Sequence, residues 1–183
     1  MVKPGVRIMG GELRGRALAV PPDARPTEGR VREALFSIWR DRLEGARVLD
    51  LFAGSGAVGL EALGRGALIV VAVDSNSRAV KIIEGNAARV GLEALEIRRL
   101  TLPAGLERLA DRGPFDLVFA DPPYAFAAYE DLLQGAAPLL APDGEIAVEH
   151  SARRELPIEV GPLTRVEVRR YGESAVSFYR GRG

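Results

Sequence analysis

The 183-residue sequence contains no cysteine and no long apolar run. Without cysteine, disulfides and thiolate chemistry are excluded. No segment approaches the roughly 20 apolar residues that a membrane-spanning helix needs. The first residues, MVKPGVRIMGGELRGR, lack the apolar core of an export signal. We therefore expect a cytoplasmic protein that makes no membrane contact.

Lysine is almost absent too, so arginine supplies nearly all of the 25 basic residues. The zero net charge hides an uneven distribution: residues 1–40 carry 8 basic and 4 acidic side chains (+4), residues 41–150 carry 10 and 17 (−7), and residues 151–183 carry 7 and 4 (+3). The basic N-terminal segment could bind phosphates, or it could be an ordinary solvated surface. Charge alone does not distinguish a phosphate-binding surface from an ordinary solvated one. The arginines concerned are Arg7, Arg14, Arg16, Arg25, Arg30 and Arg32.

From residue 46 onward, strand-like and helix-like segments alternate at the spacing of βαβ units. This pattern predicts an α/β fold with a mostly parallel sheet. The expected strands cover 46–52, 68–74, 95–100, 115–121 and 144–150, and the expected helices cover 57–65, 77–91, 102–111 and 126–140. Two further strands, 165–171 and 174–180, flank a Gly-Glu turn and predict a final hairpin. No linker divides the chain, so residues 1–183 are expected to form one domain.

The first 40 residues have a different pattern. Residues 6–20 predict a β-hairpin appended to the sheet, because two short apolar segments surround a glycine-rich turn. Thr27 is a suitable N-cap for the helix that follows. Val31, Leu35, Ile38 and Trp39 share one face of that helix, and Trp39 is expected to anchor the core.

The stretch DLFAGSGAVG, residues 50–59, follows the first predicted parallel strand and has the spacing GxGxxG. By itself this spacing is a weak signal, since it also fits a tight turn without a ligand. Asp50 ends the strand before the loop, and Asp74 ends the next strand, where an acid can accept hydrogen bonds from both ribose hydroxyls of a nucleoside. Together they favour a nucleoside-containing cofactor.

Two cofactors fit this arrangement, a nicotinamide dinucleotide and S-adenosylmethionine (SAM). Asp50 would stand beside the pyrophosphate of a dinucleotide, where two negative charges would repel each other. The same carboxylate is favourable near the ammonium group of a methionine moiety. We therefore expect SAM.

The stretch FDLVFADPPY, residues 115–124, begins as a buried strand and ends in a turn with unusual chemistry. Pro122 and Pro123 cannot donate to a strand ladder, and they hold the preceding residues extended. Asp121 and the Pro122 carbonyl are then two acceptors in fixed directions, and Tyr124 offers a flat face beside them. Such a set suits a planar base that carries an exocyclic amine. The alternative is a strand-ending turn whose tyrosine packs on the core.

DPPY together with DLFAGSGAVGLEAL resembles class I SAM-dependent methyltransferases that modify exocyclic amines. With RIMGGELRGRALAVP and RPTEGRVREALF added, the chain resembles the RsmD family, which methylates N2 of guanine 966 in 16S ribosomal RNA of the small subunit. The resemblance covers residues 7 to about 150. It implies a Rossmann-like sheet of seven strands with the last strand antiparallel, a SAM-binding catalytic core (44–183), and an N-terminal extension (1–43) that contacts RNA.

The resemblance also implies roles for individual residues. The methionine end of SAM would lie against Asp50, Phe52, Ala53, Gly54 and Gly56, and its ribose would bind Asp74. Near the adenine amine such enzymes commonly place an Asp or Asn, and here Thr101 or a backbone carbonyl would take that contact. The target guanine would be held by Asp121, Pro122, Pro123 and Tyr124, with Asp121 and the Pro122 carbonyl accepting from the amine. No metal is expected, and a monomer is expected.

Several alternatives stay open at this point. DPPY also serves adenine-N6 methylation of nucleic acids, although the short chain has no separate DNA-reading domain. Protein glutamine methyltransferases typically carry Asn at the position of Asp121. An NAD-dependent oxidoreductase would need only the glycine loop and Asp74. A non-enzymatic RNA-binding assembly factor would leave Asp121 and its prolines unexplained. His150, the single histidine, is expected to be structural.

Overall fold

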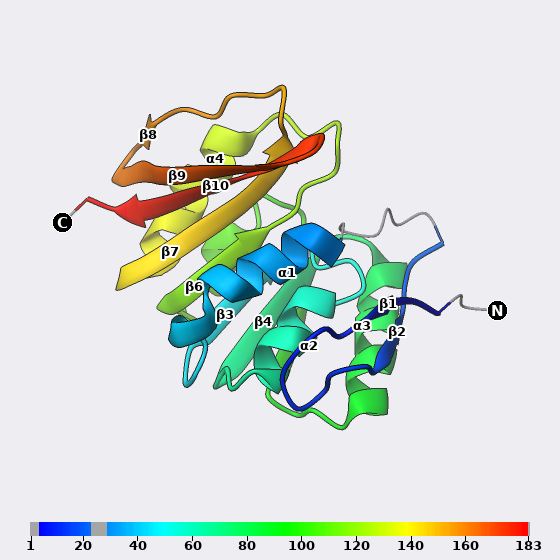
Figure 1. Ribbon diagram of the computed structural model, residues 1–183. Helices are drawn as coiled ribbons and strands as arrows, with labels where there is room; N and C mark the ends of the chain where they lie inside the picture. The colour runs from blue at the N-terminus through cyan, green and yellow to red at the C-terminus, as the bar shows by residue number, and fades with distance from the viewer. Residues whose placement is uncertain (1–3, 23–28, 183) are drawn as a thin grey trace.

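The computed structural model describes residues 4–22 and 29–182. Eight strands form its main sheet, shown in Figure 1. Their bounds are Arg47–Leu51 (β3), Ile69–Asp74 (β4), Leu95–Arg99 (β5), Phe115–Ala120 (β6), Leu140–Ser151 (β7), Glu159–Val160 (β8), Leu163–Tyr171 (β9) and Ser174–Gly181 (β10). They are ordered β5-β4-β3-β6-β7-β10-β9-β8 across the sheet.

Strands β3 to β7 run parallel, and β10 is antiparallel to both of its neighbours, β7 and β9. The predicted α/β fold with an antiparallel last strand is thereby confirmed. The sheet has eight strands instead of seven because the short β8 pairs with the start of β9. A strand of two residues carries no alternation that a sequence pattern could reveal.

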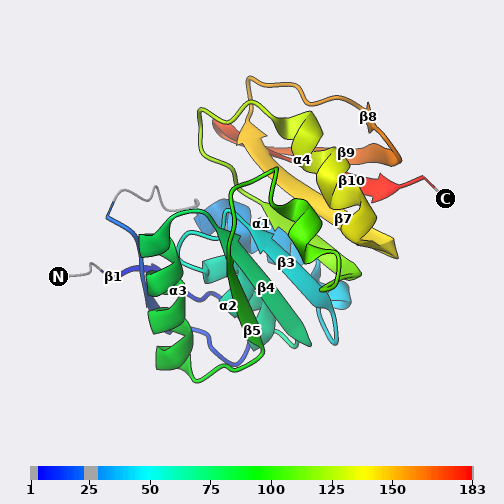
Figure 2. The ribbon, with the colours of Figure 1, turned by 180° about the vertical axis from the view of Figure 1, so that it is seen from behind.

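The helices lie on both faces of the sheet. Their bounds are Gly29–Ile38 (α1), Ala57–Gly64 (α2), Ser77–Val90 (α3) and Tyr129–Ala136 (α4), with 3₁₀ turns at Arg40–Arg42 (η1), Leu106–Leu109 (η2) and Ala137–Leu139 (η3). Figure 1 shows α1 and α2 in front of the sheet, and Figure 2 shows α4 in front of its opposite face. The chain is thus doubly wound, and it reverses direction across the sheet between β3 and β6.

Each face of the sheet has its own core. Trp39, which follows α1, and Val58 of α2 pack with β3, β4 and β6 residues such as Phe119. On the opposite face, Leu133 of α4 packs with Val118 and other residues of the same strands. Strand residues alternate between the two clusters because successive side chains point to opposite faces.

Two predicted helices are shorter than expected. Over 102–111 only η2 forms; Gly105, directly before it, has a low propensity for the α-helix. Over 126–140, α4 ends at Ala136 and continues as η3, which contains Pro138. Among the described residues, no helix is long and apolar enough to cross a membrane.

The N-terminal hairpin forms from Pro4–Arg7 (β1) and Ala17–Ala19 (β2), but it does not extend the main sheet as predicted. It is a two-stranded sheet of its own that packs on α2 and α3 (Figure 1). Side chains and helix ends satisfy its outer backbone groups: Ala19 N donates to Asn86 Oδ1 (2.8 Å), and Glu12 N donates to the Gly64 carbonyl (2.8 Å). These contacts with α2 and α3 hold the hairpin in place of the predicted pairing with the main sheet.

A buried ion pair ties α1 and the hairpin to the core. Glu61 of α2 is fully buried, and its Oε2 lies 3.2 Å from Arg32 Nε and accepts from Met9 N at 3.2 Å. Arg32 also donates to the Arg7 carbonyl at 2.6 Å. Val31 and Leu35 of α1 are buried, and so is Trp39 directly after the helix, as predicted. The predicted N-cap, Thr27, lies outside the described residues.

Candidate active site

The loop between β3 and α2 is tightly curled. Phe52, Gly54 and Gly56 have φ values of 58°, 60° and 75°, so three of five successive residues are left-handed. For Phe52, a bulky residue, this conformation is strained. A side chain on Gly56 would place its Cβ 3.0 Å from Ile83 Cγ2. The loop therefore needs glycine there to pass close to α3, and it presents backbone rather than side chains at the sheet edge.

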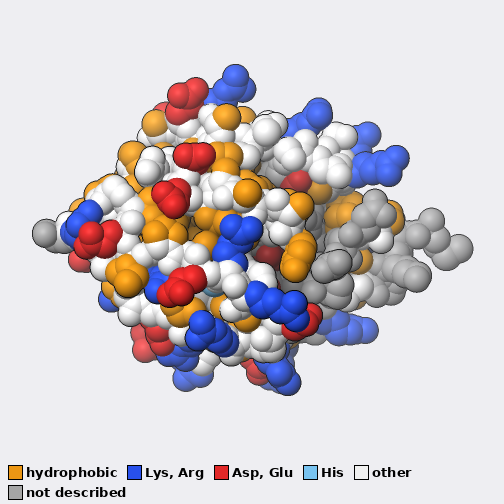
Figure 3. Space-filling model, turned by 90° about the horizontal axis from the view of Figure 1, so that it is seen from above, with side chains coloured by type: hydrophobic (Ala, Val, Ile, Leu, Met, Phe, Trp, Pro, Cys, Tyr) orange, Lys and Arg blue, Asp and Glu red, His pale blue; other side chains and the backbone are white. Residues whose placement is uncertain are grey.

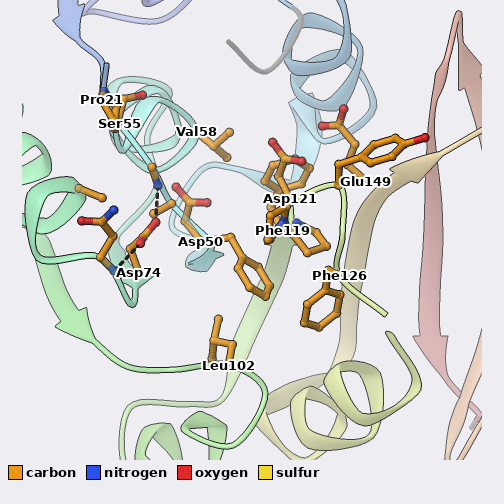
Figure 4. A pocket seen from close by; sticks show the side chains of 18 of the residues that line it. Pro21, Asp50, Ser55, Val58, Asp74, Leu102, Phe119, Asp121, Phe126 and Glu149 are labelled. Atoms are coloured by element: carbon orange, nitrogen blue, oxygen red, sulfur yellow. Dashed lines mark hydrogen bonds between the residues drawn. The ribbon is translucent and has the colours of Figure 1, made fainter. Parts of the chain in front are cut away.

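Two acids hold this loop in place. Asp50 Oδ2 accepts from Gly59 N at 3.1 Å, which fixes the start of α2 against the end of β3. Asp74 Oδ2 accepts from Gly54 N at 2.9 Å, and its Oδ1 accepts from Asn76 N at 2.9 Å, as Figure 4 shows. A carboxylate has about four acceptor sites. Asp74 therefore retains acceptor capacity for ligand hydroxyls.

Asp50 is buried, and this changes its acidity. Burial raises the pKa of its carboxyl from 3.8 to about 7; the Gly59 hydrogen bond opposes this rise, and the charges of Asp121 and Asp74 add to it. Three carboxyl groups thus surround the carboxyl ends of β3, β4 and β6. A cation bound among them would be attracted and would favour the ionised form of Asp50.

The DPPY turn lies at the same edge. Asp121 N donates to the Leu51 carbonyl at 3.4 Å, which holds the turn against the end of β3. Pro122 is buried, whereas the Tyr124 side chain is 78% exposed. Phe126 N donates to the Pro123 carbonyl at 2.8 Å and closes the turn. The Tyr124 ring and the Asp121 carboxylate thus both line the cavity at this edge.

One cavity of about 1230 Å³ unites the two motifs. It exceeds the roughly 300–1000 Å³ of a typical small-molecule site, so it has room for two ligands side by side. Every predicted cofactor- and base-binding residue lines it except Gly56, which lies behind the loop surface. The lining residues among them are Asp50, Phe52, Ala53, Gly54, Asp74, Thr101, Asp121, Pro122, Pro123 and Tyr124.

The cavity also contains residues that the sequence pattern did not identify. Glu149 lies at its edge beside Asp121 (Figure 4), and Phe126 stacks edge-on against Phe52 with ring centroids 5.3 Å apart. A signal for Glu149 existed, because it lies near the end of a predicted parallel strand, as Asp50, Asp74 and Asp121 do. Phe126 follows a turn and carried no such signal.

His150 lies in the cavity wall with both ring nitrogens engaged by the protein. Nε2 is 2.8 Å from Ser177 Oγ, and Nδ1 is 2.9 Å from the Ser151 carbonyl. Burial lowers its pKa, which favours the neutral ring. These contacts agree with the structural role expected for this residue.

The N-terminal arginines are not equivalent. Four of them are exposed, namely Arg7, Arg14, Arg16 and Arg30. Arg32, expected among the RNA contacts, is only 3% exposed and is paired with Glu61. It lies in the wall of the cavity and not on the outer surface with the other arginines. Arg25 lies outside the described residues. On the face seen in Figure 3, basic and acidic side chains are interspersed and form no single patch.

The fold and the site together define a class I methyltransferase. In the doubly wound sheet, a glycine loop follows β3 and an acid ends β4. An acid-Pro-Pro-aromatic turn follows β6, which is the neighbour of β3 where the strand order reverses. SAM is the cofactor of this class, and the site fits it: the Asp50 carboxyl suits its ammonium group, and Asp74 suits its ribose.

The chain belongs to the RsmD family. The family model described as "Conserved hypothetical protein 95" matches residues 6–180. The ribosomal RNA small subunit methyltransferase D of Escherichia coli K12 is 38% identical over 85% of this chain and 77% of its own length. Bacillus subtilis YlbH, described as a candidate rRNA methyltransferase, is 34% identical over 97% of this chain and its full length. A solved hypothetical protein of Thermus thermophilus superposes with a TM-score of 0.83, at 37% identity, covering 96% of this chain and 99% of that chain.

Proposed function

We propose that this protein methylates the exocyclic N2 amine of guanine 966 in 16S ribosomal RNA of the small subunit, with SAM as methyl donor. One observation carries the proposal: the glycine loop and the DPPY turn, far apart in sequence, line one cavity. The name of the E. coli relative supports an RNA of the small subunit as substrate.

The cofactor half of the cavity lies over β3 and β4. Asp50 and the backbone of residues 52–54 would hold the methionine end, and Asp74 would accept from the ribose hydroxyls. Thr101 lies farther along the same wall, beside Leu102, where the adenine would extend. When bound, SAM supplies an electrophilic methyl group on a sulfonium.

The base half lies over the end of β6. The N2 lone pair of guanine is delocalised into the ring, which makes the amine a poor nucleophile. Asp121 and the Pro122 carbonyl would accept its two hydrogens and direct the lone pair across the switch point, so positioning supplies much of the rate. The negative charge of Asp121 stabilises the positive charge that develops on the nitrogen. Tyr124 would stack on the base once it has flipped out of its helix.

The RNA around the target would be held by the N-terminal extension, residues 1–43, while residues 44–183 form the catalytic core of one domain. The exposed arginines would bind backbone phosphates, together with Arg25. Arg32 is left out of this set because it is committed to Glu61. Every proposed residue comes from one chain, so a monomer suffices, and a ribosomal substrate implies action in the cytoplasm.

The competing functions make different demands on this site. An oxidoreductase would have to place a dinucleotide pyrophosphate beside Asp50, and it gives Asp121 no role. Adenine-N6 methylation could use the same turn, so it remains the main competitor. A non-enzymatic assembly factor would need neither the acid nor the cofactor cavity.

The proposal is tested by offering labelled SAM with several acceptors in parallel: small subunits that lack the modification, naked 16S rRNA, duplex DNA and a release factor. We expect label in ribosomal RNA and none in the DNA or the protein. NAD binding without SAM binding, or label in the release factor, would contradict the proposal.

A further inference from the structure

A second carboxylate lies beside Asp121 in the base half of the cavity. Ala120 of β6 pairs with Val148 of β7, so Asp121 and Glu149 follow as neighbours at the ends of two parallel strands. Both line the cavity, and Figure 4 shows their side chains on the same side of it. Glu149 is 8% exposed. An acid this buried is uncommon in proteins, and this one stands where the target base would enter.

Another acid of the same strand provides a comparison. Glu145, four residues earlier in β7, is 2% exposed and accepts from Trp39 Nε1 at 2.8 Å. It also pairs with Arg42 at 3.4 Å and Arg180 at 2.6 Å. These partners lie at the opposite end of β7, away from the cavity. Glu149 lies at the cavity end, where a ligand can reach it.

Guanine presents two kinds of donor side by side on its Watson–Crick edge, the N2 amine and the N1–H, whose nitrogens are both bonded to C2. If Asp121 accepts from N2, the neighbouring carboxylate is placed for the hydrogen on N1. Adenine and other bases with an unprotonated N1 present a lone pair there, which a carboxylate repels. The two acids stand on neighbouring strands, about 4.8 Å apart, so their side chains can converge on two donors of one base.

We propose that Glu149 accepts the N1–H of the target guanine and thereby selects guanine over bases whose N1 carries no hydrogen. The inference rests on the proposed function and names the residue that sets its base specificity. No proton is transferred in this contact. The carboxylate also draws the N1–H toward itself, which leaves more electron density on the ring and its amine.

The test compares two target bases in two enzymes. Small subunits are reconstituted with 16S rRNA that carries guanine or 2-aminopurine at the target position. 2-Aminopurine keeps the N2 amine but has a lone pair at N1. Wild-type enzyme and Glu149→Gln are assayed for kcat/KM on both, because a glutamine amide can donate to that lone pair. Differences in amine reactivity and the missing O6 of 2-aminopurine affect both enzymes alike and cancel in the ratio.

We expect wild type to prefer guanine strongly, and Glu149→Gln to reduce the guanine to 2-aminopurine ratio about 10- to 100-fold, the range for one good base contact. If Glu149→Gln still binds SAM and its guanine to 2-aminopurine ratio stays within about 2-fold of the wild-type ratio, the inference is overturned.

Two further variants separate specificity from stability. Glu145→Gln, in the same strand and also buried, should lower the unfolding temperature and leave the base ratio unchanged. Glu149→Asp keeps a carboxylate, so it should keep the guanine preference at a lower rate, and it serves if Glu149→Gln does not fold. A ratio shifted as far by Glu149→Asp as by Glu149→Gln would indicate shape rather than hydrogen bonding and contradict the inference.

Failure of the inference is distinguishable from failure of the proposed function. A wild-type enzyme that leaves guanine unmodified and methylates adenine overturns both. A wild-type enzyme that forms N2-methylguanosine, with an unchanged ratio in Glu149→Gln, overturns the role of Glu149 alone.

Discussion

The backbone N–H of Gly54 donates to Oδ2 of Asp74 at 2.9 Å, so the first glycine of the loop and the acid that ends β4 fix each other's position. The same carboxylate caps the turn after β4 through Asn76 N at 2.9 Å. A residue proposed to bind the cofactor therefore also shapes the loop on which the cofactor would lie.

Replacing Asp74 should weaken cofactor binding. In Asp74→Ala, Gly54 and Asn76 lose their acceptor and the ribose loses its partner, so SAM affinity should fall about 10- to 100-fold, as for the loss of hydrogen bonds to a charged group. Titration calorimetry measures this. Asp111→Ala removes an acid whose side chain is 70% exposed, and should leave the affinity unchanged. Equal affinities in the two variants would contradict the assignment.

Asp50 should make stability depend on pH. Its folded-state pKa of about 7 lies above its ordinary value of 3.8, so the protonated form favours folding. This contribution is fully present below about pH 3.8 and is lost as the pH rises through 7. The Asn side chain of Asp50→Asn does not titrate, so this variant lacks the pH-dependent loss. Between pH 4 and about 7 its free energy of unfolding should therefore rise relative to that of wild type by about 1.4 kcal/mol per pH unit.

Urea denaturation of both proteins without SAM, at several pH values, measures the difference between their free energies of unfolding. The other titrating groups are the same in both proteins, so their contributions cancel in this difference. A difference that stays constant between pH 4 and 8 would contradict the raised pKa of Asp50. The same variant should bind SAM more weakly at pH 8, because it cannot present a negative charge to the ammonium group.

Asp121 should affect turnover far more than cofactor binding. In Asp121→Ala the amine loses an acceptor and its developing charge loses a partner, so kcat should fall about 10²- to 10³-fold. SAM affinity should stay within a few-fold of wild type, since Asp121 lies in the base half. Single-turnover methyl transfer and calorimetry measure the two quantities, and near-normal turnover would refute the role.

Arg32 and Arg14 should separate a structural arginine from an RNA contact. Arg32→Ala removes one of the two arginines that pair with the buried Glu61 and leaves Arg65 in place at 2.7 Å, so it should destabilise the fold by about 1–3 kcal/mol. Arg14 is exposed, and Arg14→Ala should keep stability while it weakens RNA binding and reduces the salt dependence by about one unit of slope. If Arg14→Ala binds RNA as wild type does, the N-terminal arginines form an ordinary solvated surface and not an RNA contact.

The sequence predicted those site residues that follow a simple rule. Asp50, Asp74 and Asp121 follow apolar runs, and the carboxyl ends of parallel strands meet at one edge, so their convergence could be expected before any coordinates. Glu149 also lies near the end of a parallel strand, but no glycine loop or proline turn follows it to mark it as part of a site. Phe126 could not be found this way, because its place depends on the path of the turn.

Arg32 shows why surface charge is hard to read from a sequence. Its place in α1 looks like that of the exposed Arg30, and only the fully buried Glu61 on α2 distinguishes them. The position of the hairpin was equally hidden, since Asn86, which binds Ala19, lies 67 residues away. Long-range polar contacts leave no periodic signal.

We propose above that this site methylates the N2 amine of one guanine. The most direct measurement is nucleoside mass spectrometry of 16S rRNA after small subunits lacking the modification react with enzyme and SAM. We predict a single N2-methylguanosine that maps to position 966 and is absent with Asp121→Ala. N6-methyladenosine would show that the target is adenine, and methylated guanosine formed equally well without Asp121 would show that Asp121 does not act on the amine.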